Sequence, residues 1–209
     1  MSHIGRYRLT LRRVLDAAFF ASNRSGCGNV LDRLLTLGLV QSRVLSGRLC
    51  YYQLTAQGAT DRFPVSRTRR LGPRQLRHAL AILWFCHMQG QRRVRLEPEE
   101  LAQRLPAAPA RPHCLEAGKR LRLHQVRVPG AHTQLGSAIS ELRECVRQAA
   151  ADPTLAAWMR SREYRFALLV DPARVARMRA AVQRTGLADT VSVEGVEGLK
   201  LLQPQRQDL

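Results

Sequence analysis

The residues best suited to bond-breaking chemistry lie between positions 112 and 127. His113 and His124 stand on either side of Glu116 and Lys119 in this segment. Metal-assisted hydrolysis of a phosphodiester needs convergent carboxylates to hold the ion, with a lysine or similar group near the attacking water. Glu116 is the single acid here, and one carboxylate cannot assemble such a site. We therefore expect Glu116 and Lys119 to be surface residues of a hairpin, and we predict no catalytic residues.

Other catalytic and cofactor patterns are missing from the sequence. The five cysteines are widely scattered and form no Cys-x-x-Cys pair, so neither a disulfide framework nor a zinc knuckle is predicted. His78 and His87 do not share one clean helix face, which favours structural roles over metal binding. The chain has no Walker loop, no Gly-rich dinucleotide turn and no convincing Cys-His or Ser-His arrangement. We predict neither a metal nor a cofactor.

Recognition of DNA is predicted for the segment from Thr10 to Phe63. Two short amphipathic helices are followed there by a Gly-tipped hairpin and by Leu-Thr-x-x-Gly, an order typical of a winged helix. Arg33 is the candidate for base reading, and we expect the hairpin arginines on phosphate or in the minor groove. The full set of predicted DNA contacts is Arg24, Ser25, Asn29, Arg33, Arg43, Ser46, Gly47 and Arg48.

Hydrophobic periodicity defines the elements that would position these residues. Thr10 is expected to cap the first helix, and Gly38 to end the second, which is the predicted recognition helix. Residues 39–45 and 49–54 suit two strands, with a tight turn at Ser46-Gly47. The residues expected to face inward are Leu11, Val14, Leu15, Ala18 and Phe19 of the first helix and Val30, Leu31, Leu34 and Leu35 of the second.

The charge of the chain supports a polyanionic partner. The formal net charge is +18 over 209 residues, and only Lys119 and Lys200 are lysines. A field this positive concentrates nucleic acids and makes their binding dependent on salt. Winged helices also occur as pure protein-interaction modules, and this alternative stays open on the motif alone.

A basic segment and an apolar helix follow the predicted winged helix. The boundary is expected between residues 61 and 73, where Arg62, Arg67, Arg69 and Arg70 form either a solvated connector or a track along a phosphate backbone. The next helix, over residues 73–88, is apolar on nearly all sides.

The apolar helix needs cover, and two sources are open. The winged helix begins so close to the N-terminus that it has little room for a further first helix, so the 73–88 helix either packs in its place or forms a dimer interface. We predict a homodimer whose interface buries four residues of this helix: Leu80, Leu83, Trp84 and Phe85.

The remaining sequence predicts a small mixed α/β domain. A short helix near residues 99–105 and an extended spacer over 106–112 precede it. Strands then alternate with helices, which implies a mixed sheet with helices packed on it. The predicted strands are 113–117, 121–128, 164–170 and 190–196, and the predicted helices are 134–151, a Trp158-containing helix and 172–185, ending at Gly186.

The chain resembles the replication-relaxation family of plasmid and mobile-element proteins. The resemblance spans most of the chain and rests on a combination of loose motifs. These are Arg8-Leu-Thr, Leu31-Asp-Arg-Leu34 with Gly38-Leu-Val40, Tyr51-Tyr-Gln-Leu-Thr55 through Gly58, Leu76-Arg-His78, Pro112-His113 and Tyr164-Arg-Phe-Ala-Leu-Leu-Val170.

The family implies an N-terminal DNA-binding winged helix and a C-terminal domain similar to the PD-(D/E)xK nuclease core. A nuclease core of this type would have an Asp after Pro112, but this chain has His113 there. The next strand contains Gln125 and Arg127 and no acidic residue. The implied α+β fold is therefore a winged helix-turn-helix followed by a degenerate nuclease core. The predicted domains are 1–63 for DNA binding, 64–112 for linker, packing or dimerisation helix and spacer, and 113–209 for the nuclease-like domain.

Three classes of function follow. The first is a non-enzymatic, sequence-specific binder of double-stranded DNA that regulates transcription, replication or mobilisation as a homodimer, with its C-terminal domain available to a protein partner. The second is a metal-dependent nucleic-acid-processing enzyme or replication accessory factor, and a structural adaptor is a third. No apolar run approaches the roughly 18 residues of a membrane span and no signal-peptide segment is evident, so we expect no membrane association and a cytoplasmic protein.

Overall fold

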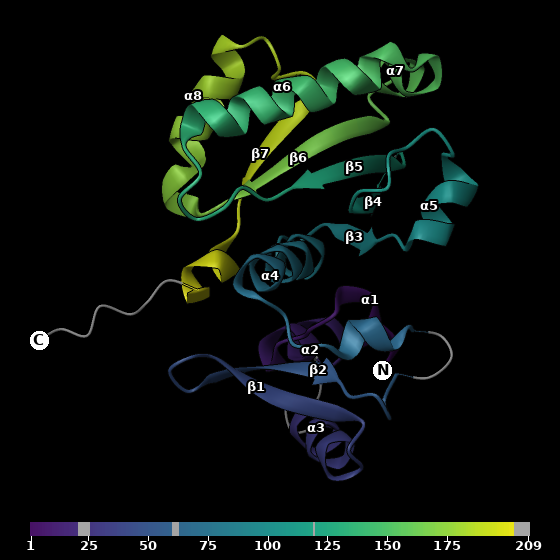
Figure 1. Ribbon diagram of the computed structural model, residues 1–209, viewed down its shortest axis with the longest axis vertical. Coiled ribbons are helices and arrows are strands. Elements are labelled where there is room, and N and C mark those ends of the chain that lie inside the picture. The colour runs from purple at the N-terminus through teal and green to yellow at the C-terminus, as the bar shows by residue number, and fades with distance from the viewer. Residues whose placement is uncertain (21–25, 60–62, 119, 203–209) are drawn as a thin grey trace, which may run out of the picture. The chain divides into compact units, whose positions relative to one another are not determined.

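The computed structural model describes residues 1–20, 26–59, 63–118 and 120–202, and it divides into two compact units (Figure 1). Unit 1 comprises Met1–Gly90 together with Gly198–Leu209, and unit 2 comprises Gln91–Glu197. Both units combine helices with a β-sheet, so the predicted α+β class is confirmed. The described helices include none with the length and apolarity needed to cross a bilayer.

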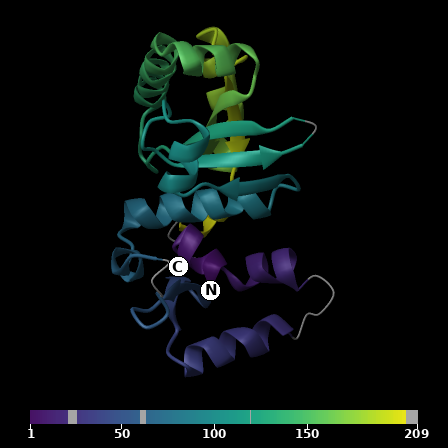
Figure 2. The ribbon, with the colours of Figure 1, turned by 90° about the vertical axis from the view of Figure 1, so that its right-hand side faces the viewer.

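Unit 1 surrounds a two-stranded antiparallel hairpin with short helices. In Figure 2, α2 and α3 lie one above the other, joined by a segment outside the described residues. Its elements are α1 (Ser2–Tyr7), α2 (Arg12–Phe19), α3 (Gly26–Thr36), β1 (Val40–Ser46), β2 (Leu49–Leu54), the 3-10 turn η1 (Val65–Thr68), α4 (Pro73–His87) and the 3-10 segment η3 (Glu197–Leu202).

Glycines and one threonine define the hairpin and its connection to α3. Gly38 follows α3 at φ 66° and Gly47 forms the turn at φ 53°, a backbone region that glycine enters without steric cost. The Thr55 hydroxyl donates to the Gly38 carbonyl at 2.5 Å and accepts from the Gly58 N–H at 3.0 Å. A Cβ on Gly58 would lie only 1.8 Å from the Leu39 carbonyl oxygen. The Leu-Thr-x-x-Gly motif therefore locks the end of the hairpin against the end of α3.

Three local predictions for α2 are wrong. Thr10 is fully buried and pairs its backbone with Tyr52 of β2, while Leu11 occupies the N-cap position. Thr10 thus adds a strand-like bridge to the hairpin instead of capping a helix. Ala18 and Phe19, both expected inward, are exposed, and Phe19 is 58% exposed. The helix is only eight residues long, so its last turn extends beyond the core that buries Val14 and Leu15.

The expectation about a first helix is also corrected. Six residues suffice for α1, which places Ile4 and Tyr7 in the core of unit 1. The short N-terminal segment therefore contributes the extra helix that it was expected to lack. The aromatic rings of His3 and Tyr7 lie 4.9 Å from the His87 ring, which joins α1 to α4. Burial and the neighbouring His87 lower the pKa of His3 to about 3, so His3 is neutral in this cluster at neutral pH.

The predicted dimer interface on α4 is corrected as well. Leu80, Leu83 and Phe85 are 0% exposed in the single chain and Trp84 is 6% exposed. Within unit 1, the Arg13 guanidinium lies 4.0 Å from the Trp84 ring centre, and Gly198 packs against the same ring. The premise that too few residues in the chain could cover these four side chains is wrong. They are not available to a second copy.

Unit 2 is built on a five-stranded sheet in the order β3-β4-β5-β6-β7. The first three strands form an antiparallel meander, and β5, β6 and β7 are parallel. Helical crossovers connect the parallel strands, as such pairing requires. The elements are β3 (Arg92–Arg95), α5 (Pro98–Arg104), β4 (His113–Ala117), β5 (Arg122–Arg127), α6 (Leu135–Ala151), α7 (Pro153–Arg160), β6 (Tyr164–Val170), η2 (Pro172–Arg174), α8 (Val175–Arg184) and β7 (Val191–Gly195).

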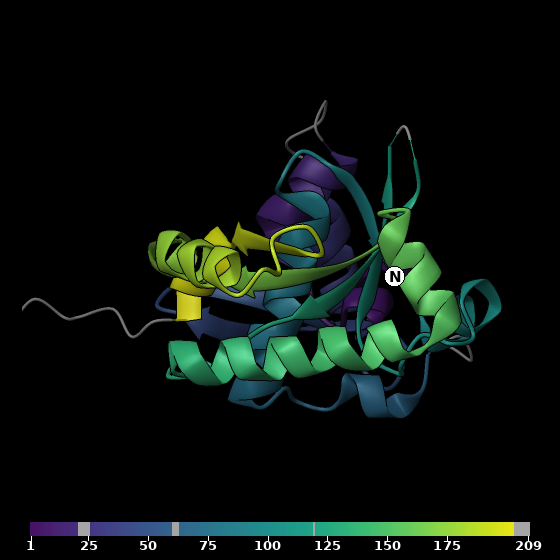
Figure 3. The same cartoon turned by 90° about the horizontal axis from the view of Figure 1, so that it is seen from above.

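The core of unit 2 lies between one face of this sheet and its helices. Leu142 of α6, Leu155 of α7 and Met178 of α8 pack there with Phe166 and Leu168 of β6. Figure 3 shows α7 turning away from α6. Asp152 stands between the two helices, and its carboxylate accepts the Leu155 N–H and caps α7. The predicted C-terminal strands and helices all occur, with bounds shifted by a few residues.

The domain boundaries differ from those predicted. The strand β3 was not expected, and it moves the start of the second unit from residue 113 to Gln91. Residues 63–72 are not a free linker either. Phe63 and Leu71 are buried, and Arg67 donates to the Gly5 carbonyl at 2.9 Å. This segment packs on unit 1 through contacts between residues distant in sequence, which periodicity cannot indicate.

Candidate nucleic-acid interface

The exposed face of α3 contains two of the predicted DNA contacts. Cys27 and Leu31, at 0% and 2% exposure, hold the inner face of the helix against α2 and the hairpin. Asn29 and Arg33 are exposed, one turn apart on the opposite face. The helix thus presents an amide and a guanidinium side by side. Such side chains can form bidentate hydrogen bonds with adenine and guanine edges.

The hairpin tip supplies a second predicted group. Gly47 and Arg48 are exposed, and Ser46 is half-buried beside them. The turn carries a register shift between Val44 and Ser46, so the tip is an irregular, small-residue turn followed by one exposed cation. A narrow tip of this kind suits a phosphate row or a minor groove.

Arg43 lies apart from both groups. It is half-buried, and its guanidinium donates to the Gln41 side chain at 3.0 Å. Side chains alternate along a strand, so Arg43 shares a face with Gln41 and Tyr51, whereas Tyr52 packs on the other face against Cys27 and Leu31. The structure therefore does not place Arg43 on the α3 side of the hairpin.

Two predicted contacts, Arg24 and Ser25, lie outside the described residues, as do Arg62 and Lys119. One basic residue beside α3 was overlooked in the sequence. Arg12 of α2 is exposed, and its guanidinium lies 3.2 Å from where a Cβ would stand on Gly28, in the first turn of α3. A side chain is missing at Gly28, about one turn before Leu31, and this was the available signal. Arg12 adds positive charge near the start of the exposed face.

His113 and Gln125, from the segment considered for metal chemistry, form a buried, neutral group with Tyr164 in unit 2. The Tyr164 hydroxyl lies 3.0 Å from His113 Nε2 and 2.8 Å from the Gln125 side-chain oxygen, while His113 Nδ1 lies 2.8 Å from the Arg111 carbonyl. Burial lowers the pKa of His113 to about 4 and raises that of Tyr164. Because His113, Gln125 and Tyr164 are at most 2% exposed, this group links β4, β5 and β6 and offers no access to a substrate.

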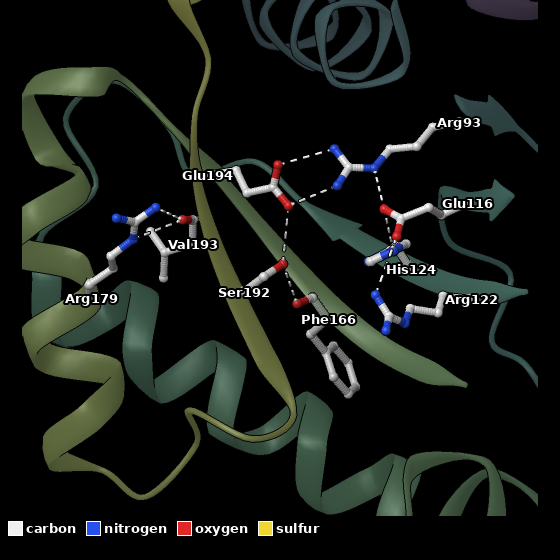
Figure 4. Close-up of polar contacts among 9 residues, drawn as sticks. All are labelled: Arg93, Glu116, Arg122, His124, Phe166, Arg179, Ser192, Val193 and Glu194. Atoms are coloured by element: carbon white, nitrogen blue, oxygen red, sulfur yellow. Dashed lines mark hydrogen bonds and ion pairs between the residues drawn. The ribbon is translucent and has the colours of Figure 1, made fainter. Parts of the chain in front are cut away.

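Glu116 belongs to a different cluster (Figure 4). Its odd spacing from His113 along β4 places it on the other face of the sheet. Arg93 donates to Glu116 at 2.7 Å through Nε and to both carboxylate oxygens of Glu194 at 3.1 and 3.2 Å. His124 Nε2 lies 3.4 Å from Glu116. Hydrogen bonding from His124 and then from Arg93 lowers the pKa of Glu116 to about 2, against an opposing effect of burial. We name Arg93, Glu116, His124 and Glu194 the Arg93 cluster.

The Arg93 cluster corrects the interpretation of Glu116 as a hairpin surface residue. Its side chain is 14% exposed, and a second acid, Glu194 of β7, converges on the same arginine. Arg93 contacts both carboxylates, and Arg122 lies 3.5 Å from the other oxygen of Glu116, so two guanidinium groups balance the two acids and join the strands. Over the described ranges of the chain, no three His, Cys, Asp or Glu side chains are grouped so as to hold a metal ion. Glu194 was missed because 78 residues separate it from Glu116.

Comparisons of the chain with protein-family models, with curated proteins and with solved structures give no match.

Proposed function

We propose that the protein binds double-stranded DNA sequence-specifically through a winged helix formed by unit 1. In this proposal α3 enters the major groove, the β1–β2 hairpin is the wing, and the chain regulates transcription, replication or mobilisation of a mobile element. Unit 2 is proposed to be a degenerate, non-catalytic nuclease-like domain that serves assembly or a protein partner.

One observation carries the proposal. Asn29 and Arg33 occupy the exposed face of a helix whose opposite face is anchored by buried Cys27 and Leu31, and the adjoining hairpin ends in an exposed arginine, Arg48. This pairing of a base-reading face with a cationic tip occurs in a chain of net charge +18. Positive charge provides sequence-independent attraction to phosphate, and the helix face provides discrimination between bases.

A homodimer remains part of the proposal, because its two recognition helices would read two half-sites separated by one turn of the DNA duplex. Its interface is not placed on α4, whose apolar residues the chain itself buries. Sedimentation of the chain alone and on DNA measures the oligomeric state directly.

Binding to a randomised duplex library at matched salt tests the function. Arg33→Ala should weaken binding to the selected duplex by about 1–3 kcal/mol and remove the sequence preference at one base position. Arg48→Ala should weaken binding to all duplexes alike and reduce the slope of log affinity against log salt concentration by about 1. The control is Arg184→Ala, an exposed arginine of α8, which should leave the ratio of specific to nonspecific affinity unchanged. Equal binding by the parent and both unit 1 variants would refute the assignment.

A metal-dependent nucleic-acid-processing enzyme is the second candidate, favoured by the convergence of Glu116 and Glu194. The guanidinium of Arg93 holds both carboxylates, so we expect no cleavage of supercoiled, linear or single-stranded DNA with magnesium or manganese. Cleavage that is lost in Glu116→Ala would favour the enzyme over the regulator.

A further inference from the structure

An exposed valine interrupts the polar face of α3. Hydrophobic periodicity predicts Val30 to point inward, yet its side chain is 45% exposed, whereas the next residue, Leu31, is 2% exposed. Nearly half of the surface of Val30 is thus left outside the core of unit 1. Burying that surface elsewhere is favourable in proportion to the area removed from water.

The surroundings of Val30 indicate what covers it. Asn29 precedes it and Arg33 follows one turn later, both exposed, so a partner that meets Val30 also meets an amide and a cation. Asp32, the exposed acid of this helix, lies at the far edge of the exposed face because residues two apart project about 200° from one another. The DNA partner proposed above supplies phosphates and base edges to Asn29 and Arg33, and Val30 would then need a small apolar group. In the major groove of DNA, the C5-methyl group of thymine is that apolar group.

We propose that Val30 contacts the C5-methyl of a thymine while Arg33 reads a guanine close to it. This inference rests on the proposed function and adds a base preference to it. Side chains three apart on a helix are separated by roughly 5–6 Å at Cβ, which corresponds to one or two base steps at about 3.4 Å each. The preferred site therefore contains thymine within two base steps of guanine.

A second exposed apolar residue provides a matched control. Leu37 is 50% exposed but stands after the last residue of α3, about two turns from Val30. Seven residues of helix correspond to about 10 Å along its axis, so Leu37 cannot reach the base that Val30 contacts. Leu37→Ala removes exposed apolar surface from the same segment without removing the proposed methyl contact.

The experiment uses the full chain and the duplex selected from a randomised library at about 0.15 M salt. Each thymine of that duplex is replaced in turn by deoxyuridine, which lacks the methyl group. The parent protein should lose about fourfold in affinity at one thymine near a guanine, the effect of burying one methyl-sized group. Val30→Ala should bind the thymine duplex more weakly and no longer distinguish thymine from uracil there, whereas Leu37→Ala should keep the distinction.

Five outcomes would overturn the inference, and they separate it from the proposed function. Affinity that is insensitive to every thymine methyl refutes the role of Val30 while the proposed function stands. The same holds if Val30→Ala lowers affinity for the thymine and uracil duplexes equally. Selection without a preferred sequence refutes both the role of Val30 and the sequence specificity of the proposed function. Sedimentation that shows a dimer dissociated by Val30→Ala would assign the residue to a second copy. If no duplex is bound at all, the proposed function fails and the inference fails with it.

Discussion

At the scale of single residues, Arg93 joins opposite edges of the unit 2 sheet. It lies on the edge strand β3, and its guanidinium reaches Glu116 on β4 and Glu194 on β7, the other edge strand. The arginine side chain is 3% exposed. Removing one partner of a buried ion pair leaves an uncompensated charge. We expect Arg93→Met to lower the free energy of unfolding by about 3–5 kcal/mol, measured by urea denaturation.

The Arg93 cluster also predicts how stability depends on pH. The pKa of Glu116 is lowered from 4.5 to about 2 in the folded chain, so the unfolded chain binds the proton more tightly. The stabilisation is therefore complete above pH 4.5 and is lost as the pH falls toward 2. In Glu116→Gln the urea midpoint should fall less steeply across this window than in the parent. Glu99→Gln, an exposed glutamate of α5, should retain the parent slope, and a parental slope in Glu116→Gln would contradict the assignment.

Gly58 provides a further test at this scale. A Cβ at this position would meet the Leu39 carbonyl oxygen at 1.8 Å, and backbone cannot move aside as a flexible side chain can. We expect Gly58→Ala to lower the free energy of unfolding by about 3 kcal/mol. Gly136→Ala has open space around the new methyl group and should leave stability unchanged or raise it by about 1 kcal/mol. Similar melting temperatures for the two variants would mean that the contact of Gly58 with Leu39 is not tight.

At the scale of elements, α4 is buried on nearly all sides. Residues 79–86 are all buried in the single chain. This agrees with the prediction that α4 carries apolar side chains on nearly all of its sides. A helix that is apolar all round must be covered by its own chain or by a partner, and here its own chain covers it. The element was predicted correctly, and its role in dimerisation was not, because periodicity does not identify what supplies the cover.

Leu83→Glu distinguishes a core helix from an interface helix. Leu83 is 0% exposed, so the variant buries an unpaired carboxylate and should unfold unit 1 or destabilise it by more than about 3 kcal/mol. Circular dichroism and sedimentation together measure this result. Gln75→Glu, on the exposed first turn of α4, is the control and should leave the fold intact. A folded Leu83→Glu chain that merely changes from dimer to monomer would restore the interface interpretation.

At the scale of the whole molecule, unit 1 is discontinuous in sequence. The chain leaves it after Gly90, forms unit 2 and returns at Gly198, which lies against the Trp84 ring. Leu199 is 0% exposed. The last described residues therefore complete the core of the first unit.

This return predicts the effect of ending the chain after Glu197. Loss of Gly198 and Leu199 should expose the Trp84 ring, shift its fluorescence to longer wavelength and lower the melting temperature of unit 1. A Trp158→Phe background isolates the emission of Trp84, because the chain has two tryptophans. An unchanged emission maximum would mean that the returning segment does not cover the ring.

The sequence by itself determined most of the local structure. Apolar spacing predicted α4, α6 and the strands β4 to β7, and Gly38 and Gly186 stand at positive φ just after the helices they were expected to end. These features depend on residues within one or two turns of each other, where backbone preference and side-chain periodicity act directly. The exposed positions of Asn29, Arg33 and Arg48 follow from the same local patterns.

Only the tertiary structure decided which distant residues meet. Arg93 and Glu194 are 101 positions apart, and the charged strand β3, with alternate residues exposed, has no apolar run to mark it. Thr10 joins the hairpin because Tyr52 offers a backbone partner, and Val30 stays exposed although its spacing fits a buried face. Local periodicity shows that a surface needs cover or a charge needs a partner, but the partner is set by long-range packing that no short segment encodes.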